Sequence, residues 1–86
     1  MDSYSVFFSK SIKQDVRGIE KADLSRIMDS IHALAQNPFP SGCKRLKGAK
    51  SSYRIRVGQY RVVYEVEVDT ATVTIFRIRH RKDVYR

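Results

Sequence analysis

The sequence has few of the residues that build disulfides, metal clusters or membrane spans. Its single cysteine, Cys43, excludes an internal disulfide framework and a cysteine-based zinc cluster. No stretch reaches the ~18 apolar residues that a membrane-spanning helix needs, and no apolar N-terminal run follows a basic segment. The two histidines have no thiol or carboxylate at metal-ligand spacing. We therefore expect a soluble, cytoplasmic protein that uses no metal, no cofactor and no membrane.

The chain is also short. Its 86 residues predict a single domain over 1–86. A chain of this size buries roughly 60–65% of its unfolded surface, which allows one small core between two layers. The composition, 42% hydrophobic and 30% charged, is that of an ordinary globular protein.

Negative charge is missing from the middle of the chain. The net charge is +8, yet residues 1–40 carry as many acidic as basic side chains. Residues 41–64 carry seven basic residues and no acid. Such a segment is typical of a footprint for a polyanion or an acidic partner, although a basic small domain also gains solubility from its charge.

The N-terminal half predicts one strand and two helices. Aromatic and apolar residues at 4–8 indicate a strand, and Ser9 is a suitable N-cap for a short amphipathic helix that ends near Gly18. A clearer apolar stripe at helical spacing runs over 22–36. This second helix ends before Pro38, because the residue preceding a proline avoids helical geometry. Short connections predict that the two helices form an antiparallel hairpin.

The C-terminal half predicts three strands, at about 53–57, 60–67 and 72–79, from the alternation of apolar and polar residues. The first two are joined by Gly58-Gln59, which favours a two-residue hairpin turn. The fold class we predict is α+β. A small antiparallel sheet of about four strands packs on an N-terminal helical hairpin, in the order β-α-α-β-β-β.

The hairpin at Gly58-Gln59 holds an unfavourable pair. A two-residue turn sets Val57 opposite Tyr60 and Arg56 opposite Arg61. Like charges directly opposite each other destabilise a strand pair. The arrangement therefore suggests that something anionic binds there.

The last strand has two possible registers. A two-residue turn places Val62 opposite Arg77, on the face that the helices cover, whereas a turn one residue longer places Val62 opposite Ile78 and Tyr64 opposite Phe76. We prefer the second, because it keeps charge out of the core. It predicts an open sheet face that bears five arginines: Arg54, Arg56, Arg61, Arg77 and Arg79.

Several kinds of catalytic site are missing. There is no paired carboxylate, no Gly-rich phosphate loop and no Ser-His-Asp set. An arginine cluster remains, which suits either passive phosphate binding or cleavage of RNA by its own 2′-hydroxyl. In that reaction guanidinium groups stabilise the charge that builds on phosphate oxygens, each worth on the order of 10²–10³ in rate. The cations that we expect to contact phosphate without chemistry are Lys44, Arg45, Lys47, Lys50, Arg77 and Arg79.

Four motifs carry a resemblance to a known family: Asn37-Pro-Phe-Pro40, Lys44-Arg-Leu-Lys-Gly48, the hairpin Tyr53–Tyr64, and Arg79-His-Arg-Lys-Asp-Val-Tyr85. The chain resembles the RelE/ParE superfamily of type II toxin–antitoxin toxins, most of all its RelE-type mRNA interferases. The resemblance implies metal-independent endonucleolytic cleavage of mRNA in the ribosomal A site. It also implies neutralisation by a small acidic antitoxin encoded adjacently, so the expected partners are this antitoxin, the ribosome and mRNA.

The resemblance also implies roles for single residues. Arg54 and Arg56 match two basic residues on the family's catalytic strand, and Arg61 matches its phosphate-contacting arginine. Arg81 matches the arginine that protonates the leaving group or stabilises its charge, and Tyr85 the tyrosine that stacks on or orients the substrate.

The sequence departs from well-known members at two points. Lysines often stand at the positions of Arg54 and Arg56, and arginine cannot give up its proton to act as a base. The base is then His80, Tyr85 or a group of the ribosome. The chain ends at Arg86, so we expect no C-terminal helix. Two other functions stay open on this sequence: a ParE-like inhibitor of DNA gyrase, and a non-enzymatic RNA-binding module.

Overall fold

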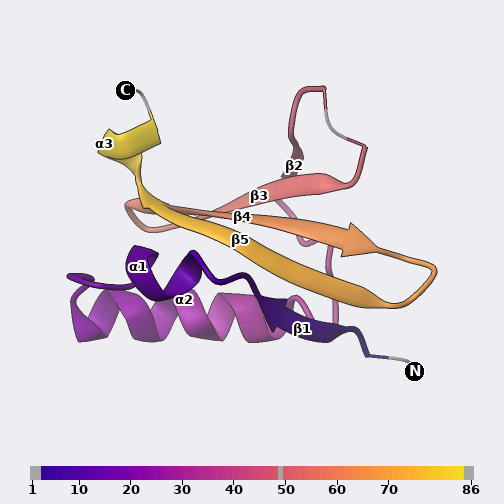
Figure 1. Cartoon of the computed structure of the whole chain (residues 1–86), viewed down its shortest axis with the longest axis horizontal. Coiled ribbons are helices and arrows are strands. Elements are labelled where there is room, and N and C mark those ends of the chain that lie inside the picture. The colour runs from indigo at the N-terminus through magenta and orange to yellow at the C-terminus, as the bar shows by residue number, and fades with distance from the viewer. Residues whose placement is uncertain (1–2, 49, 85–86) are drawn as a thin grey trace.

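One sheet covers two helices that pack against a single face of it. The computed structural model describes residues 3–48 and 50–84. Figure 1 shows the sheet lying over α1 and α2, with the opposite face of the sheet uncovered by either helix. The elements, in chain order, are β1 (Ser5–Phe8), α1 (Ile12–Asp15), α2 (Lys21–Ala33), β2 (Lys44–Arg45), β3 (Ser52–Val57), β4 (Tyr60–Glu67), β5 (Thr72–His80) and α3 (Arg81–Val84).

The sheet has the order β1-β5-β4-β3-β2. The predicted α+β class is confirmed, as are the three C-terminal strands, but the predicted antiparallel sheet of about four strands differs in two details. β2 adds a fifth strand through two residue pairs with β3, and β1 runs parallel to β5. β2 is too short to produce a period of two in the sequence. β1 is separated from β5 by most of the chain, so no tight turn sets its direction.

The apolar stripe of α2 provides the helical side of the core. Ile27, Ile31 and Leu34 are buried against the sheet. The α-helix ends at Ala33, three residues before the predicted end, because the chain tightens into turns with i→i+3 hydrogen bonds over 34–36. The carbonyl of Ala35, beyond the end of the helix, accepts a hydrogen bond from the Tyr4 backbone N–H at 2.7 Å, which docks the start of β1.

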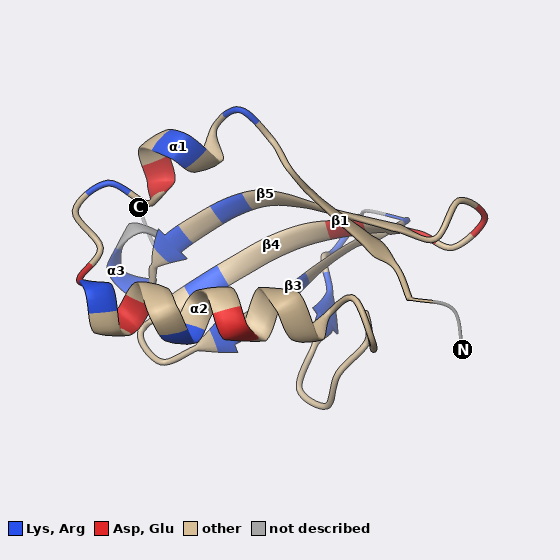
Figure 2. Cartoon of the chain, turned by 90° about the horizontal axis from the view of Figure 1, so that it is seen from below, with Lys and Arg blue, Asp and Glu red and all other residues tan. Residues whose placement is uncertain are grey.

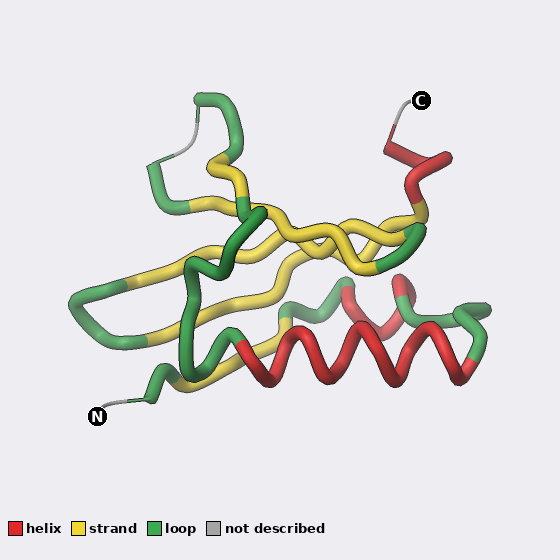
Figure 3. Tube along the Cα trace, turned by 180° about the vertical axis from the view of Figure 1, so that it is seen from behind, coloured by secondary structure: helices red, strands yellow, loops and turns green. Residues whose placement is uncertain are grey.

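The alternation of β4 provides the other side of the core. Val62, Tyr64 and Val66 are buried, and they face the helices together with buried residues of β3 and β5. The hydroxyl of Tyr64 donates a hydrogen bond of 2.8 Å to the carbonyl of Pro38. This bond holds the loop that follows α2, which Figure 3 shows passing the edge of the sheet on its way to β2.

α1 is shorter than the sequence predicts. It covers only Ile12–Asp15, its N-cap position is Ser11 rather than Ser9, and Gly18 follows with a φ of +81°. No side chain caps the helix. The hydroxyls of Ser9 and Ser11 instead bond to each other at 2.9 Å and both reach the carbonyl of Phe76 on β5.

A β-bulge explains why two registers of β5 fit the sequence. Near the Gly58 turn Val62 pairs with Ile78, as predicted, but Tyr64 pairs with Ile75 because the ladder shifts between Val63 and Tyr64. The predicted pairing of Tyr64 with Phe76 is therefore wrong, and Phe76 is exposed. A bulge adds one residue to one strand, so each register holds on one side of it.

The end of the chain adds a feature that the sequence did not predict. The short helix α3 follows β5 directly and stands on the side of the sheet away from α1 and α2, as Figures 1 and 3 show. We expected no C-terminal helix, and the four-residue helix α3 differs from that expectation. Within the described ranges, no helix is long and apolar enough to cross a membrane.

Candidate functional site

The uncovered sheet face carries cations in two rows that cross the strands. Arg56 of β3 pairs with Arg61 of β4, and Arg61 pairs with Arg79 of β5. The unfavourable Arg56–Arg61 pair that the sequence predicts is thus present and extended to a third strand. The second row, two residues further along each strand, is Lys44, Arg54, Val63 and Arg77.

The distances within and between these rows suit successive phosphates of a nucleic-acid backbone. Residues two apart on a strand lie about 7 Å from each other, and adjacent strands lie about 4.8 Å apart. Arg54 and Arg61 are half-buried, whereas Arg56, Arg77 and Arg79 are exposed. Packed strands therefore hold the central arginines, and the outer ones stay open to solvent. Aligned like charges destabilise the free sheet, and an anion bound between them removes that penalty.

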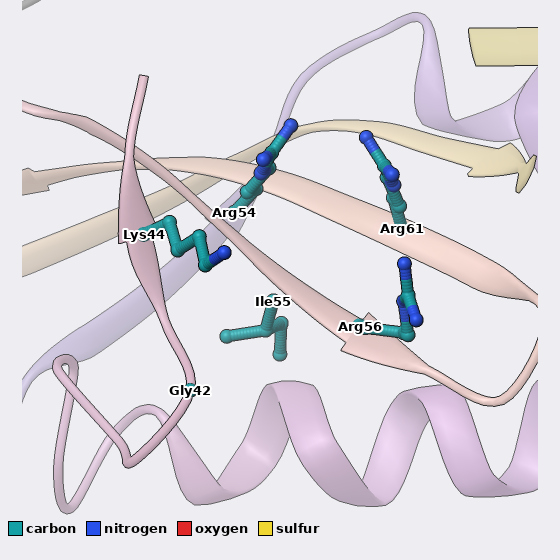
Figure 4. Close-up of a pocket in the computed structure, with 6 residues that line it drawn as sticks. All are labelled: Gly42, Lys44, Arg54, Ile55, Arg56 and Arg61. Carbon is teal, nitrogen blue, oxygen red and sulfur yellow. The ribbon is translucent and has the colours of Figure 1, made fainter. Parts of the chain in front are cut away.

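A pocket of about 290 Å³ opens between the two rows. It is lined by Gly42, Lys44, Arg54, Ile55, Arg56 and Arg61. Figure 4 shows the three arginines pointing away from α2 and Ile55 pointing toward it, with Lys44 reaching across from β2. The pocket lies at the edge of β3 beyond the end of β2, because β2 pairs only with Tyr53 and Arg54.

Charge changes sign along the same strands. On β4, Glu65 follows Val63 on the uncovered face and pairs with Ser52 and Thr74. Figure 2 shows Lys and Arg toward the end of the sheet near α3, and Asp and Glu at the turn between β4 and β5. A polyanion is therefore attracted to one end of this face and repelled from the other.

Arg81 is held beside the Gly58-Gln59 turn. Its backbone N–H donates to the carbonyl of Gln59 at 2.7 Å, and its Nη1 donates to Gln59 Oε1 at 3.4 Å. Since this turn joins Arg56 to Arg61, the two contacts bring the start of α3 to the end of the arginine row. Sequence analysis did not single out Gln59, because a turn glutamine reveals no contact with a tail more than twenty residues away.

His80 lies on the other face of the sheet. It pairs with Tyr60, whose strand neighbours Val62 and Tyr64 face the helices, and the His80 and Tyr60 rings meet edge-on at 5.2 Å. His80 Nδ1 accepts a hydrogen bond of 3.1 Å from the Lys82 backbone N–H. The Nδ1 lone pair of His80 is therefore engaged within the chain.

Arg45, Lys47 and Lys50 do not join the two rows. Arg45 pairs with Tyr53, whose ring stacks on Tyr64, so Arg45 is on the helix side of its strand. Lys47 and Lys50 are exposed in the connection from β2 to β3. Tyr85 lies outside the described residues.

These features define a small α+β protein with an arginine-lined face on one side of its sheet. Residues 6–85 match the family model of the ParE toxin of type II toxin–antitoxin systems, parDE. The chain therefore belongs to this toxin family, within the RelE/ParE superfamily that its motifs predicted.

Known relatives agree in sequence and in fold. Toxin RelE3 of Methanocaldococcus jannaschii is 33% identical over 84 residues, which cover 93% of each chain. Toxin RelG of Mycobacterium tuberculosis is 26% identical over 84 residues, covering 96% of this chain and 97% of that one. The RelE–RelB complex of Pyrococcus horikoshii contains a chain that superposes with a TM-score of 0.82 at 26% identity. The match covers 92% of this chain and 96% of that one.

Proposed function

We propose that this toxin is a ribosome-dependent mRNA endoribonuclease. The observation that carries the proposal is the row Arg56–Arg61–Arg79 with Arg81 held at its end by Gln59. The 2′-oxygen of one nucleotide attacks the adjacent phosphorus while the bond from phosphorus to the 5′-oxygen breaks. The products are a 2′,3′-cyclic phosphate and a 5′-hydroxyl, and the chemistry requires no metal ion.

In this mechanism the arginines supply charge. Arg56 and Arg61 stabilise the equatorial oxygens of the scissile phosphate, and Arg54 with Lys44 binds a neighbouring phosphate. Arg81 stabilises the charge on the departing 5′-oxygen, which takes its proton from solvent. The contacts of His80 do not support a role as the base, which leaves Tyr85, also proposed to stack on the substrate, or a ribosomal group to take the 2′-proton. A substrate positioned by the ribosome explains why this chain needs no strong base of its own.

The test is cleavage with and without ribosomes. We expect mRNA in programmed ribosomes to be cut within the A-site codon. Naked mRNA should be cut slower by several orders of magnitude, because well-oriented groups reach effective molarities of about 10⁵–10⁸ M. Primer extension maps the cuts, and a substrate with a 2′-deoxy nucleotide at the cleavage position is the control. Cleavage of that control, or equal rates without ribosomes, would contradict the mechanism.

The salt dependence of the binding constant tests whether the two rows contact RNA. For a single strand, the slope of log K against log[salt] is about −0.7 per phosphate contacted. We expect Arg79→Gln to reduce the magnitude of this slope by about 0.7 for a short oligouridylate. Arg26→Gln removes the same charge from α2, on the far side of the molecule, and should leave the slope unchanged. Equal slopes for both variants would remove Arg79 from the RNA contact.

A second function is inhibition of DNA gyrase, which the ParE description of the matching family model favours. Brief expression in cells separates the two. Gyrase poisoning induces DNA-damage signalling and leaves mRNA intact, whereas an interferase fragments mRNA without that signal. RNA binding with neither effect indicates a non-enzymatic module.

We also propose an antitoxin partner, a small acidic protein encoded next to this toxin. The solved relatives support it, because the structure from Pyrococcus horikoshii is a complex of RelE with RelB. The net charge of +8 also favours an acidic partner. Purification with the product of the adjacent gene tests this directly.

A further inference from the structure

The second half of β5 lacks a strand on one side. β1 pairs with β5 only from Ser5–Thr72 to Phe8–Ile75, and the chain then turns away into α1. Beyond Ile75, β4 is the neighbour on one side only, and the bulge at Phe76 disturbs even that ladder. Arg77 and Arg79, one from each cationic row, lie in this weakly supported part of the strand.

Side chains of the β1–α1 segment take the place of the missing strand. Ser11 donates to the carbonyl of Phe76 at 2.9 Å, and the Ser9 hydroxyl lies 2.9 Å from that of Ser11 and 3.4 Å from the same carbonyl. Asp15 Oδ2 accepts a hydrogen bond of 2.9 Å from the backbone N–H of Ile78, in a partly buried position 63 residues away in sequence. These are the backbone groups that a further strand would bind.

The contact at Ile78 lies between the two arginines. Ile78 is buried and its N–H points to the strand edge, so the flanking Arg77 and Arg79 project onto the uncovered face. A one-residue slip of a strand sends every side chain to the opposite face. The bulge next to this site makes such a slip easy, because a shift of the extra residue restores the alternative register.

We propose that Asp15 is a positioning residue for Arg77 and Arg79: by fixing the N–H of Ile78, it holds both arginines in the cationic rows. This inference rests on the proposed function for its biological meaning. Its physical content, the placement of two phosphate-binding arginines, is testable by RNA binding alone.

The residues around Asp15 determine whether its removal should strengthen or weaken RNA binding. Asp15 lines a surface pocket of about 410 Å³ together with Arg17, Arg77 and Arg79. If Asp15 acted only through its charge, its removal would strengthen RNA binding, since a repulsive group would be lost. If it positions the arginines, its removal weakens binding although the protein becomes more basic.

The experiment measures oligouridylate affinity against salt for the full-length protein. We expect Asp15→Ala to weaken binding about tenfold at low salt and to reduce the magnitude of the salt slope by about 0.7–1.4, the loss of one or two phosphate contacts. Asp15→Asn keeps an oxygen acceptor without the charge and should bind at least as well as wild type. Exchange of the Ile78 amide should accelerate about tenfold in the alanine variant and much less in the asparagine variant.

The matched control is Asp29→Ala, which removes the same charge from an exposed site on α2 and should bind RNA slightly more tightly. Destabilisation alone lowers the active fraction without changing the salt slope, so it does not imitate the expected result. Should Asp15→Ala fail to fold, Ser11→Ala removes a hydrogen bond to the same edge of β5. This variant should also bind RNA more weakly, with a smaller loss of affinity. An unchanged or tighter affinity of Asp15→Ala overturns the inference. A wild type that binds RNA but does not cut ribosome-bound mRNA overturns the proposed function instead.

Discussion

Arg61→Ala should lower the rate of ribosome-dependent cleavage by about 10²–10³-fold, the typical effect of removing one group that stabilises transition-state charge. Arg61 is the middle residue of the three-arginine row and lines the pocket between the rows. It is half-buried, so its guanidinium is held more firmly than those of its exposed neighbours. The loss should fall on kcat more than on KM, because other cations of the face still bind the RNA.

Two variants separate charge from geometry. Arg61→Lys keeps the charge but loses the planar fork that binds two phosphate oxygens at once, so its rate should lie between those of wild type and the alanine variant. Arg26→Ala removes an arginine whose side chain is 69% exposed on α2 and should cleave at the wild-type rate. Circular dichroism and a urea midpoint for Arg61→Ala establish that the variant is folded. A folded Arg61→Ala protein with full activity would exclude this site.

The sequence was sufficient to predict which residues lie on the uncovered face wherever strand pairing is local. Gly58 with Gln59 defines a two-residue turn, Gly58 has the positive φ of +60° that such a turn requires, and the strict alternation on both sides fixes which residues share a face. Arg54, Arg56 and Arg61 therefore had only one possible arrangement. These three positions were predicted correctly because they depend on neighbours fewer than ten residues apart.

The rest of the site depends on contacts that leave no local pattern. The two registers considered for β5 are both present, on either side of the Phe76 bulge, and a uniform alternation cannot represent that switch. The position of His80 on the helix-covered face follows from its pairing with Tyr60, not from its own segment. Asp15 illustrates what the sequence could not predict. Its own segment indicates only an exposed helical residue, whereas its contact with the Ile78 backbone depends on where β1 ends.

Tyr64→Ala should lower the free energy of unfolding by about 3–5 kcal/mol, the usual effect of deleting a buried aromatic ring. Tyr64 is fully buried, stacks on Tyr53 with ring centroids 6.0 Å apart, and bonds to Pro38. Because small domains have only about 5–15 kcal/mol of stability, this variant should be close to unfolded at 37 °C. Urea unfolding followed by circular dichroism measures the change.

Tyr64→Phe isolates the hydroxyl. It leaves the ring in place but removes the donor to the buried carbonyl of Pro38, which should lower stability by about 1–3 kcal/mol. Tyr53→Phe is the matched control, since the Tyr53 hydroxyl forms no hydrogen bond within the described ranges, and it should change stability by less than about 0.5 kcal/mol. Equal effects of the two substitutions would show that the bond to Pro38 contributes nothing.

The same hydroxyl gives stability a defined dependence on alkaline pH. Burial, with a smaller contribution from Cys43, raises the pKa of Tyr64 well above its ordinary value of 10.0. The folded state thus holds the phenol proton more tightly than the unfolded state does, so this stabilisation is complete below about pH 10 and decreases as the pH rises further. The urea midpoint of wild type should therefore fall more steeply above pH 10 than that of Tyr64→Phe. Parallel curves for wild type and Tyr64→Phe would mean that the Tyr64 phenol ionises as readily in the folded protein as in the unfolded chain.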